Sequence, residues 1–226
     1  MLETKLEILW TEYLRAEQVR VRQEMMSALD RFVDRLLQLP PAVWHQWAKE
    51  IAAAVSDDGA ATPVRFPLFR RVLLPALVDG VLRGEPGCAR WLASFESLLL
   101  HTPDSRLPSK LQTAVGLLAE AVRIDPTDQL ARKRLIERHA WYLEYTLHEL
   151  PSGVLYGMNG ATLEQCTELQ SLVTEFRAHL AALGQENRYA DLIHECAFHY
   201  AAYAEYLRAR PVPGGYEGFL SRRATG

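Results

Sequence analysis

The amino-acid sequence predicts an all-α fold, either an antiparallel multi-helix bundle or a short irregular helical solenoid. Apolar residues recur at spacings of three and four along most of the chain. Leu111, Val115, Leu118 and Val122, for example, fall on one helical face. No segment alternates apolar and polar residues regularly enough to predict a convincing β-strand.

The composition is that of an ordinary globular protein. The chain has 226 residues, 49% hydrophobic and 23% charged, and a chain of this length can bury a sizeable core. Its net charge is −3 with both signs interspersed, which favours neither a nucleic-acid partner nor an anionic membrane. Cys88, Cys166 and Cys196 are odd in number and widely spaced, which argues against a disulfide framework and for a reducing compartment.

The sequence also favours a cytoplasmic protein without a membrane span. Glu3, Lys5 and Glu7 place charges where a signal peptide would need an apolar core. The longest apolar stretch, residues 72–82, contains Pro75 and is far shorter than the roughly 20 residues that cross a bilayer.

The N-terminal elements follow from apolar stripes and breakers. Residues 2–39 carry two apolar stripes separated by a polar stretch, which predicts one long helix or two. Pro40 and Pro41 end this segment, because a residue before proline is pushed out of helical geometry. A shorter helix is expected over residues 43–55, followed by a turn-forming cluster at 56–63.

Residues 67–83 and 86–101 are expected to form a helical pair. Gly84 suits the position just after the first helix, and Pro86 suits the first turn of the second. Pro75 lies inside the first helix and predicts a kink or an early break there.

The remaining helices have recognisable ends. Asp125 and Pro126 stop one helix, Thr162 with Gln165 has the capping-box pattern that opens another, and Asn187 can cap the last. We expect these helices over residues 109–124, from there to 150, 162–183 and 188–210.

The predicted organisation is a single all-α domain over residues 1–210 with a flexible tail at 211–226, which is rich in proline and glycine. Within the domain, the N-terminal helix is expected to serve as a lid or a dimerisation arm, so a homodimer through this helix is one predicted assembly.

One stretch resembles a known family locally. Residues 117–135 are similar to the junction between two tetratricopeptide repeats, where a small residue, here Ala121, lies in a helix that ends in Asp-Pro, here Asp125 and Pro126. The resemblance covers about 20 residues, and a shift by the family's period of about 34 residues does not recover it. We therefore interpret it as a helix-turn-helix packing signal.

The histidine-rich segment HECAFH does not match a metalloprotease motif. His194 and His199 are five residues apart, whereas two imidazoles on one helical face need a spacing of four. Cys196 and His199 share a face, but no second pair of ligands at such spacing exists. The simpler interpretation is a buried Cys196 with histidines that pack or face solvent.

Two further patterns contain residue types that catalysis or metal binding uses. Glu144 with His148, and Glu195 with His199, have a spacing one residue longer than the pairs of helical di-iron proteins. Cys88 and Cys166 fall in early helical turns, where a thiolate is favoured, although a small buried side chain explains each of them as well. The sequence therefore predicts no catalytic residue, no metal ligand and no cofactor.

Partner-binding residues are predicted in two places. The loop over residues 151–161 carries apolar side chains inside a connection rich in glycine and asparagine, and it either caps the core or faces a partner. Aromatic stripes on two later helices contain tyrosines, whose hydroxyls suit a boundary with water. The predicted residues are Leu155, Tyr156, Met158, Tyr145, His148 and Tyr203.

These observations predict a non-catalytic, cytoplasmic protein–protein interaction module. It would be an adaptor or a cognate inhibitor of the immunity-protein type, two roles that composition does not separate. The alternative is a helical protein or enzyme that binds a metal or a small molecule through histidine and glutamate side chains.

Overall fold

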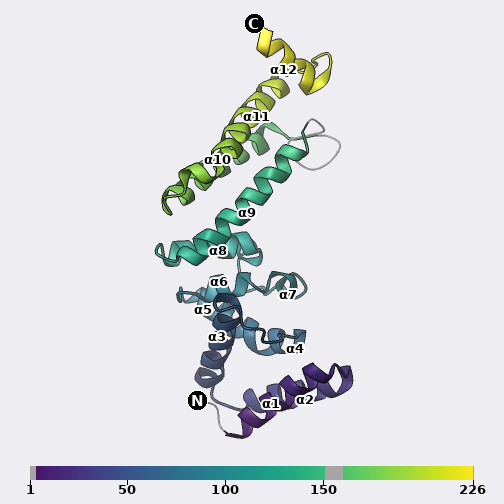
Figure 1. Ribbon diagram of the computed structural model, residues 1–226, viewed down its shortest axis with the longest axis vertical. Coiled ribbons are helices and arrows are strands. Elements are labelled where there is room, and N and C mark those ends of the chain that lie inside the picture. Colours follow the sequence, from purple (N-terminus) through teal and green to yellow (C-terminus); the bar gives the residue numbers. More distant parts are fainter. Residues whose placement is uncertain (1–3, 151–159, 226) are drawn as a thin grey trace. The chain divides into compact units, whose positions relative to one another are not determined.

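The computed structural model describes residues 4–150 and 160–225, and every regular element in these ranges is a helix (Figure 1). The predicted all-α class is confirmed. The chain forms two compact units, Met1–Ala131 and Arg132–Gly226, and each is described by itself below. The prediction of one domain over residues 1–210 stays a prediction.

The first unit is built from short helices. In chain order they are α1 (Thr4–Val19), α2 (Arg22–Leu36), α3 (Pro41–Asp57), α4 (Phe66–Leu68), the π-helical turn η1 (Phe69–Leu73), α5 (Leu74–Leu82), α6 (Cys88–Ala93), α7 (Glu96–Leu100), the 3-10 turn η2 (Ser109–Gln112) and α8 (Ala114–Ile124).

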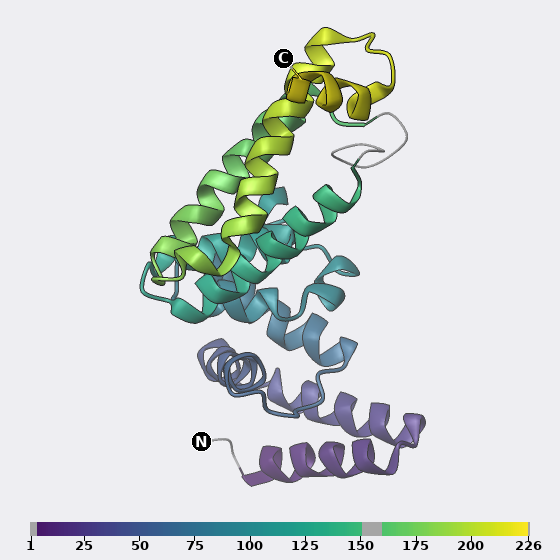
Figure 2. The same ribbon diagram turned by 45° about the horizontal axis from the view of Figure 1, so that its top comes forward.

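The N-terminal segment forms two helices, α1 and α2, packed as a hairpin (Figure 2). The break lies at Arg20, whose φ of 61° ends α1 in left-handed geometry. Arg20 is the one described residue other than glycine with a positive φ. An L-residue with a Cβ adopts this geometry at a cost, so the connection carries local strain.

An aromatic cluster joins this hairpin to α3. The Phe32 ring lies 4.9 Å from Trp10 and 5.1 Å from Trp47, measured between centroids, and Trp10 also contacts Tyr13 at 5.2 Å. Phe32 and Tyr13 are completely buried. α1, α2 and α3 therefore share one small core.

Pro75 changes the helix around it without ending the helix. The backbone ladder switches from α to π geometry over η1, where the amide of Leu74 donates to the carbonyl of Phe69. A proline has no amide to donate and crowds the preceding turn, and a π turn before it relieves this conflict. The predicted kink or break is thus realised as a π turn.

The helical pair around Gly84 follows the sequence only in part. Gly84 has a φ of 67°, as expected for the position after a helix. Pro86 does not lie in the next helix, because α6 begins at Cys88 after Gly87. The single helix predicted over residues 86–101 is divided into α6 and α7.

The second unit has longer helices. They are α9 (Gln129–His148), which starts at the end of the first unit, α10 (Leu163–Ala181), the 3-10 turn η3 (Glu186–Tyr189), α11 (Ala190–Ala209) and α12 (Gly215–Thr225). α10 and α11 lie side by side in both views and are joined through η3 (Figures 1 and 2).

Residues from α9, α10 and α11 form a common core in this unit, which includes Leu143, Phe176 and Tyr200. The capping box is confirmed, since Thr162 accepts from the amide of Gln165 and the Gln165 side chain accepts from the amide of Thr162.

Two predictions for the C-terminal region differ from the structure. Asn187 lies in η3 and does not cap α11, which begins at Ala190 after Tyr189. The segment predicted as a flexible tail contains α12, and Tyr216 at its start is only 5% exposed. The many glycines and prolines of this segment predict a loop. The helix forms nevertheless because its aromatic residues pack onto α11.

Candidate functional site

The outer face of α9 carries two of the predicted partner-binding residues. Tyr145 is half-buried and stacks on Trp141, with ring centroids 5.9 Å apart and planes 17° apart. Trp141 is 64% exposed, and His148 is exposed one turn further along. Because these residues are spaced by four and three, they lie along one helical face. The spacing that predicted Tyr145 and His148 therefore brings them together.

Tyr203 corrects that list. It is 2% exposed and packs against Tyr206 and Tyr216, with ring centroids 5.5 Å and 4.9 Å away. A side chain buried to this degree supports the fold and presents no surface to a partner. Burial raises the pKa of the Tyr203 hydroxyl, as expected for a phenol held away from water.

Leu155, Tyr156 and Met158 lie outside the described residues. Their predicted role in partner binding stays a prediction.

The histidines of HECAFH have separate environments. His194 is exposed, and His199 has its Nδ1 atom 2.9 Å from the hydroxyl of Tyr216. Cys196 between them is completely buried. Within residues 4–150 and 160–225, no group of three or more histidine, cysteine, aspartate or glutamate residues is placed to hold a metal ion.

The three cysteines are buried thiols. Burial raises the pKa of Cys88 and of Cys196 to about 11 and also raises that of Cys166. The Cys88 thiol lies 3.8 Å from a Glu85 carboxylate oxygen, which further disfavours ionisation. A nucleophilic cysteine needs a lowered pKa and access, so the burial of these thiols and the raised pKa of each favour the packing interpretation.

Sequence patterns did not reveal a pair of neighbouring histidines, the buried His139 on α9 and the half-buried His179 on α10. His139 is 4% exposed, and its Nδ1 atom has no hydrogen-bond partner among the described residues. Its ring lies 6.1 Å from that of His179 and 6.4 Å from that of Phe176. Burial lowers the pKa of His139 to about 4, so this imidazole is neutral at physiological pH.

His179 is held in one tautomer by its two neighbours. Arg132 donates to its Nδ1 atom at 3.1 Å, because a guanidinium has only donors. The proton of the neutral ring is then on Nε2, which faces a Glu175 oxygen at 3.3 Å. The burial of His139 makes the stability of this unit depend on pH.

We expect His139 to cost the second unit about 2 kcal/mol of unfolding free energy between pH 7 and pH 5. The unfolded histidine binds a proton near pH 6.5, whereas the folded one binds it only near pH 4. The contribution of the neutral His139 to stability is therefore fully present above pH 6.5 and is lost as the pH falls toward 4. Urea denaturation at both pH values, with hydrogen exchange of peptides from residues 132–226, measures the loss.

His139→Leu isolates this contribution, since it removes the buried imidazole while His45 and His199, whose pKa values are also lowered, remain. The variant should lose about 2 kcal/mol less than the original chain over the same pH interval. An equal loss in both proteins would contradict the assignment to His139.

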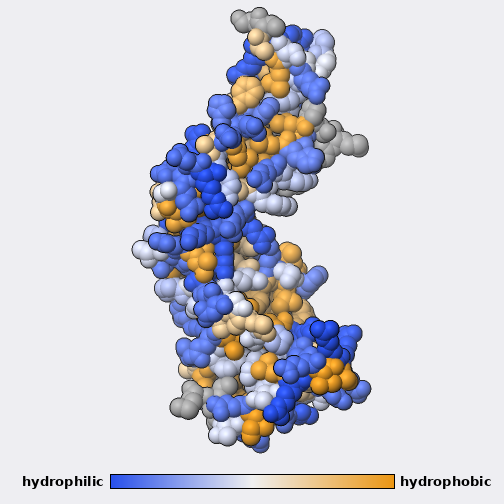
Figure 3. All heavy atoms as spheres, in the orientation of Figure 1, coloured by the Kyte–Doolittle hydropathy of each residue, from blue (hydrophilic) through white to orange (hydrophobic). Residues whose placement is uncertain are grey.

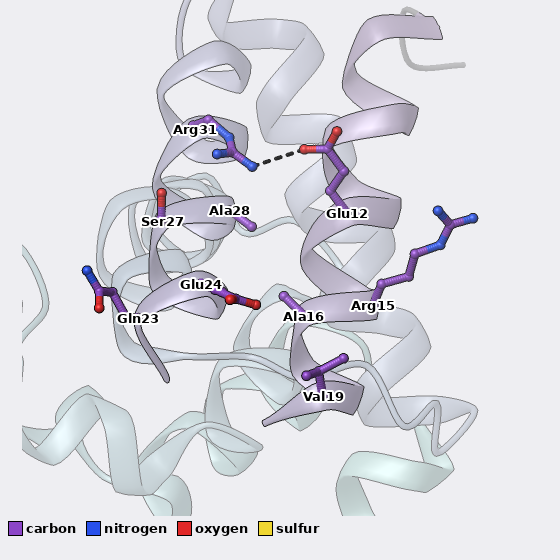
Figure 4. A pocket seen from close by; sticks show the side chains of 9 residues that line it. All are labelled: Glu12, Arg15, Ala16, Val19, Gln23, Glu24, Ser27, Ala28 and Arg31. Carbon is purple, nitrogen blue, oxygen red and sulfur yellow. Dashed lines mark hydrogen bonds and ion pairs between the residues drawn. The ribbon is translucent and has the colours of Figure 1, made fainter. Parts of the chain in front are cut away.

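A groove of about 810 Å³ runs between α1 and α2 (Figure 4). Ala16 and Ala28 form part of its floor, and Arg31 of α2 donates to Glu12 of α1 at 3.1 Å across one end. Figure 4 shows Glu24 turned toward α1 and Arg15 pointing away from the groove. The groove is shallow, mixed in charge and open to water, features that suit a contact with another chain better than enclosure of a small molecule.

None of the described helices combines the length and the apolar character that crossing a bilayer requires. Comparison with models of protein families, with curated proteins and with solved structures finds no match to this chain.

Proposed function

We propose that this protein is a non-catalytic protein–protein interaction module of the cytoplasm, acting as an adaptor or as a cognate inhibitor of the immunity type. The observation that carries the proposal is the Trp141–Tyr145 pair on the outer face of α9. A tryptophan that is 64% exposed is a large apolar surface in contact with water.

The chemistry of this face suits recognition of a protein. Tryptophan and tyrosine are enriched among the residues that contribute most binding energy at protein interfaces. Stacking on Tyr145 limits the rotamers of Trp141, so less side-chain entropy is lost when a partner covers it. His148, one turn away, adds a polar group at the edge of the same face.

Trp141→Ala is expected to weaken binding of a stoichiometric partner by at least about 30-fold, which corresponds to about 2 kcal/mol. The partner is first captured with the tagged full-length chain from its own cell lysate, and the purified pair is then measured by calorimetry. A single tight one-to-one partner favours an inhibitor, whereas several weak peptide ligands favour an adaptor.

Phe198→Ala is the matched control, because Phe198 is another exposed aromatic residue of the second unit, at 45% exposure on α11. It should leave the affinity unchanged. If both variants bind as tightly as the original chain, the α9 face is not the partner surface.

A homodimer through the N-terminal helix is a second proposal, supported by the groove between α1 and α2. Within the described part of the chain, neither Arg15 nor Glu24 forms an ion pair; Glu24 turns toward α1 beside this groove, and the Arg15 guanidinium points outward from its edge (Figure 4). In a twofold dimer each could pair with the other residue of the second copy. The mass of the full chain in sedimentation velocity tests this.

The alternative class, a metal-binding or small-molecule-binding protein, stays a prediction from the sequence. The side chains it invoked are distributed over α9 and α11: His148 with Glu144 on the first, and His194 and His199 with Glu195 on the second.

A further inference from the structure

A second hollow, of about 870 Å³, lies at the tip of the α1–α2 hairpin beside the segment that enters α4. Its apolar wall consists of Met25, Met26, Phe66 and Pro67. Met25 is buried, Met26 is half-buried and Phe66 is 38% exposed. Methionine side chains are flexible and polarisable, so such a wall adapts to an inserted apolar side chain.

Arginines surround this apolar wall. Arg65 donates two hydrogen bonds of 2.7 Å to the carboxylate of Glu17. The positive charge of Arg65 is therefore balanced by the negative charge of Glu17. Arg20 and Arg22 also line the hollow, and among the described residues no carboxylate forms an ion pair with either. The hollow therefore has an excess of positive charge, although the chain as a whole has a net charge of −3.

The exposed surface continues around the tip. Val19 is 65% exposed and Val21 is 43% exposed, on either side of Arg20. In Figure 3, hydrophobic atoms lie beside strongly hydrophilic ones at this end of the hairpin, whose place is given in Figure 1. Apolar side chains alternating with unpaired arginines leave both kinds of group open to a partner.

The backbone conformation at Arg20 is a further observation that favours a role for this side chain outside the local fold. Its φ of 61° is a conformation that glycine adopts freely and that a residue with a Cβ adopts only with strain. A glycine adopts this conformation without the penalty of a Cβ, so the turn does not require the arginine side chain. Arg20→Gly therefore removes the guanidinium group while the turn is preserved, so a change in binding can be assigned to the side chain.

We propose that this hollow binds an acidic segment of a partner protein. One apolar side chain of the segment enters between the methionines and Phe66, and flanking carboxylates pair with Arg20 and Arg22. Guanidinium groups bind carboxylates in a bidentate manner, and a local positive excess attracts acidic partners to this end of the molecule.

A protein segment fits better than a lipid surface, because the apolar residues line a concavity and an extended bilayer surface does not enter one. The hollow is lined by residues of the first unit, whereas Trp141 and Tyr145 belong to the second, so neither proposal depends on the other.

The test selects peptides from a random display library on the full-length chain. Enriched peptides should carry aspartate or glutamate on both sides of an apolar residue. Combining Arg20→Gly with Arg22→Gln should weaken binding of such a peptide by at least about tenfold in fluorescence anisotropy. The affinity should also fall as sodium chloride is raised, because exposed ion pairs are screened.

Three controls distinguish the outcomes. Arg123→Gln removes an exposed arginine of α8 and should leave peptide binding unchanged, as should Trp141→Ala on α9. Circular dichroism of the Arg20→Gly, Arg22→Gln variant should show an intact fold. The proposal is overturned if the enriched peptides have no acidic bias, or if the variant binds them as well as the original chain does. Binding of vesicles containing phosphatidylserine that the variant loses, without peptide binding, would assign the tip to a membrane instead.

Discussion

Phe32→Ala is expected to lower the unfolding free energy of the first unit by about 4 kcal/mol. Phe32 is completely buried and contacts the rings of Trp10 and Trp47, so its removal leaves a cavity between three helices. The cost has two parts, the lost burial of the ring and the lost contacts of the residues that lined it.

Urea denaturation followed by tryptophan fluorescence suits this measurement, because Trp10 and Trp47 border the substituted site. Phe32→Leu is the matched control and should cost less than half as much, since leucine refills most of the space. A loss below about 1 kcal/mol for the alanine variant would show that α1, α2 and α3 do not share the core described here.

Arg90→Met is expected to cost about 3 kcal/mol. Arg90 on α6 pairs with Asp57 at the end of α3 and, at 2.7 Å, with Asp128 just before α9. The side chains of Arg90 and Asp128 are 12% and 9% exposed, so removing the cation leaves carboxylates in a poorly hydrated place. Breaking a buried pair costs more than the pair contributes, because the remaining charge stays desolvated.

Partial recovery in a double variant tests this explanation. Adding Asp128→Asn to Arg90→Met removes one of the unpaired charges and should restore about 1 kcal/mol, measured as the midpoint of urea denaturation at constant slope. Asp128 also accepts from the amide of Ala131 at 2.9 Å, and asparagine preserves that acceptor. If the double variant is less stable than the single one, unpaired charge is not the cause.

The prediction of helices succeeded where a local signal acts within a few residues. Pro40 and Pro41 follow the end of α2, Gly84 follows α5 with a positive φ, and Thr162 with Gln165 forms a capping box. Each of these depends on backbone geometry that the residue itself imposes. Helices held by packing were found less well: α12 was missed, and the expected helix around residues 86–101 is two helices.

The prediction of the site likewise succeeded for features set by local spacing and failed for features set by packing. Spacing correctly placed Tyr145 and His148 on one face of α9 but could not distinguish that face from the stripe containing Tyr203, which is buried against Tyr216. The hollow at the hairpin tip was not predicted, since Met25 and Phe66 are brought together only by the return of the chain into α4. Within the sequence, the one sign of it is the alternation of valine and arginine over residues 19–22.

The sequence by itself determined the helical class and the helix ends marked by proline, glycine and the capping box, because periodicity and backbone chemistry act locally. The tertiary structure alone decided which side chains are inside. His139 and Trp141 are two residues apart on α9, yet the imidazole is 4% exposed and the indole 64%. From side-chain chemistry alone, the apolar indole would be expected to be buried and the polar imidazole to be exposed. Burial is set by where α10 and α11 pack against α9, which involves residues too distant in the sequence for any local pattern to report.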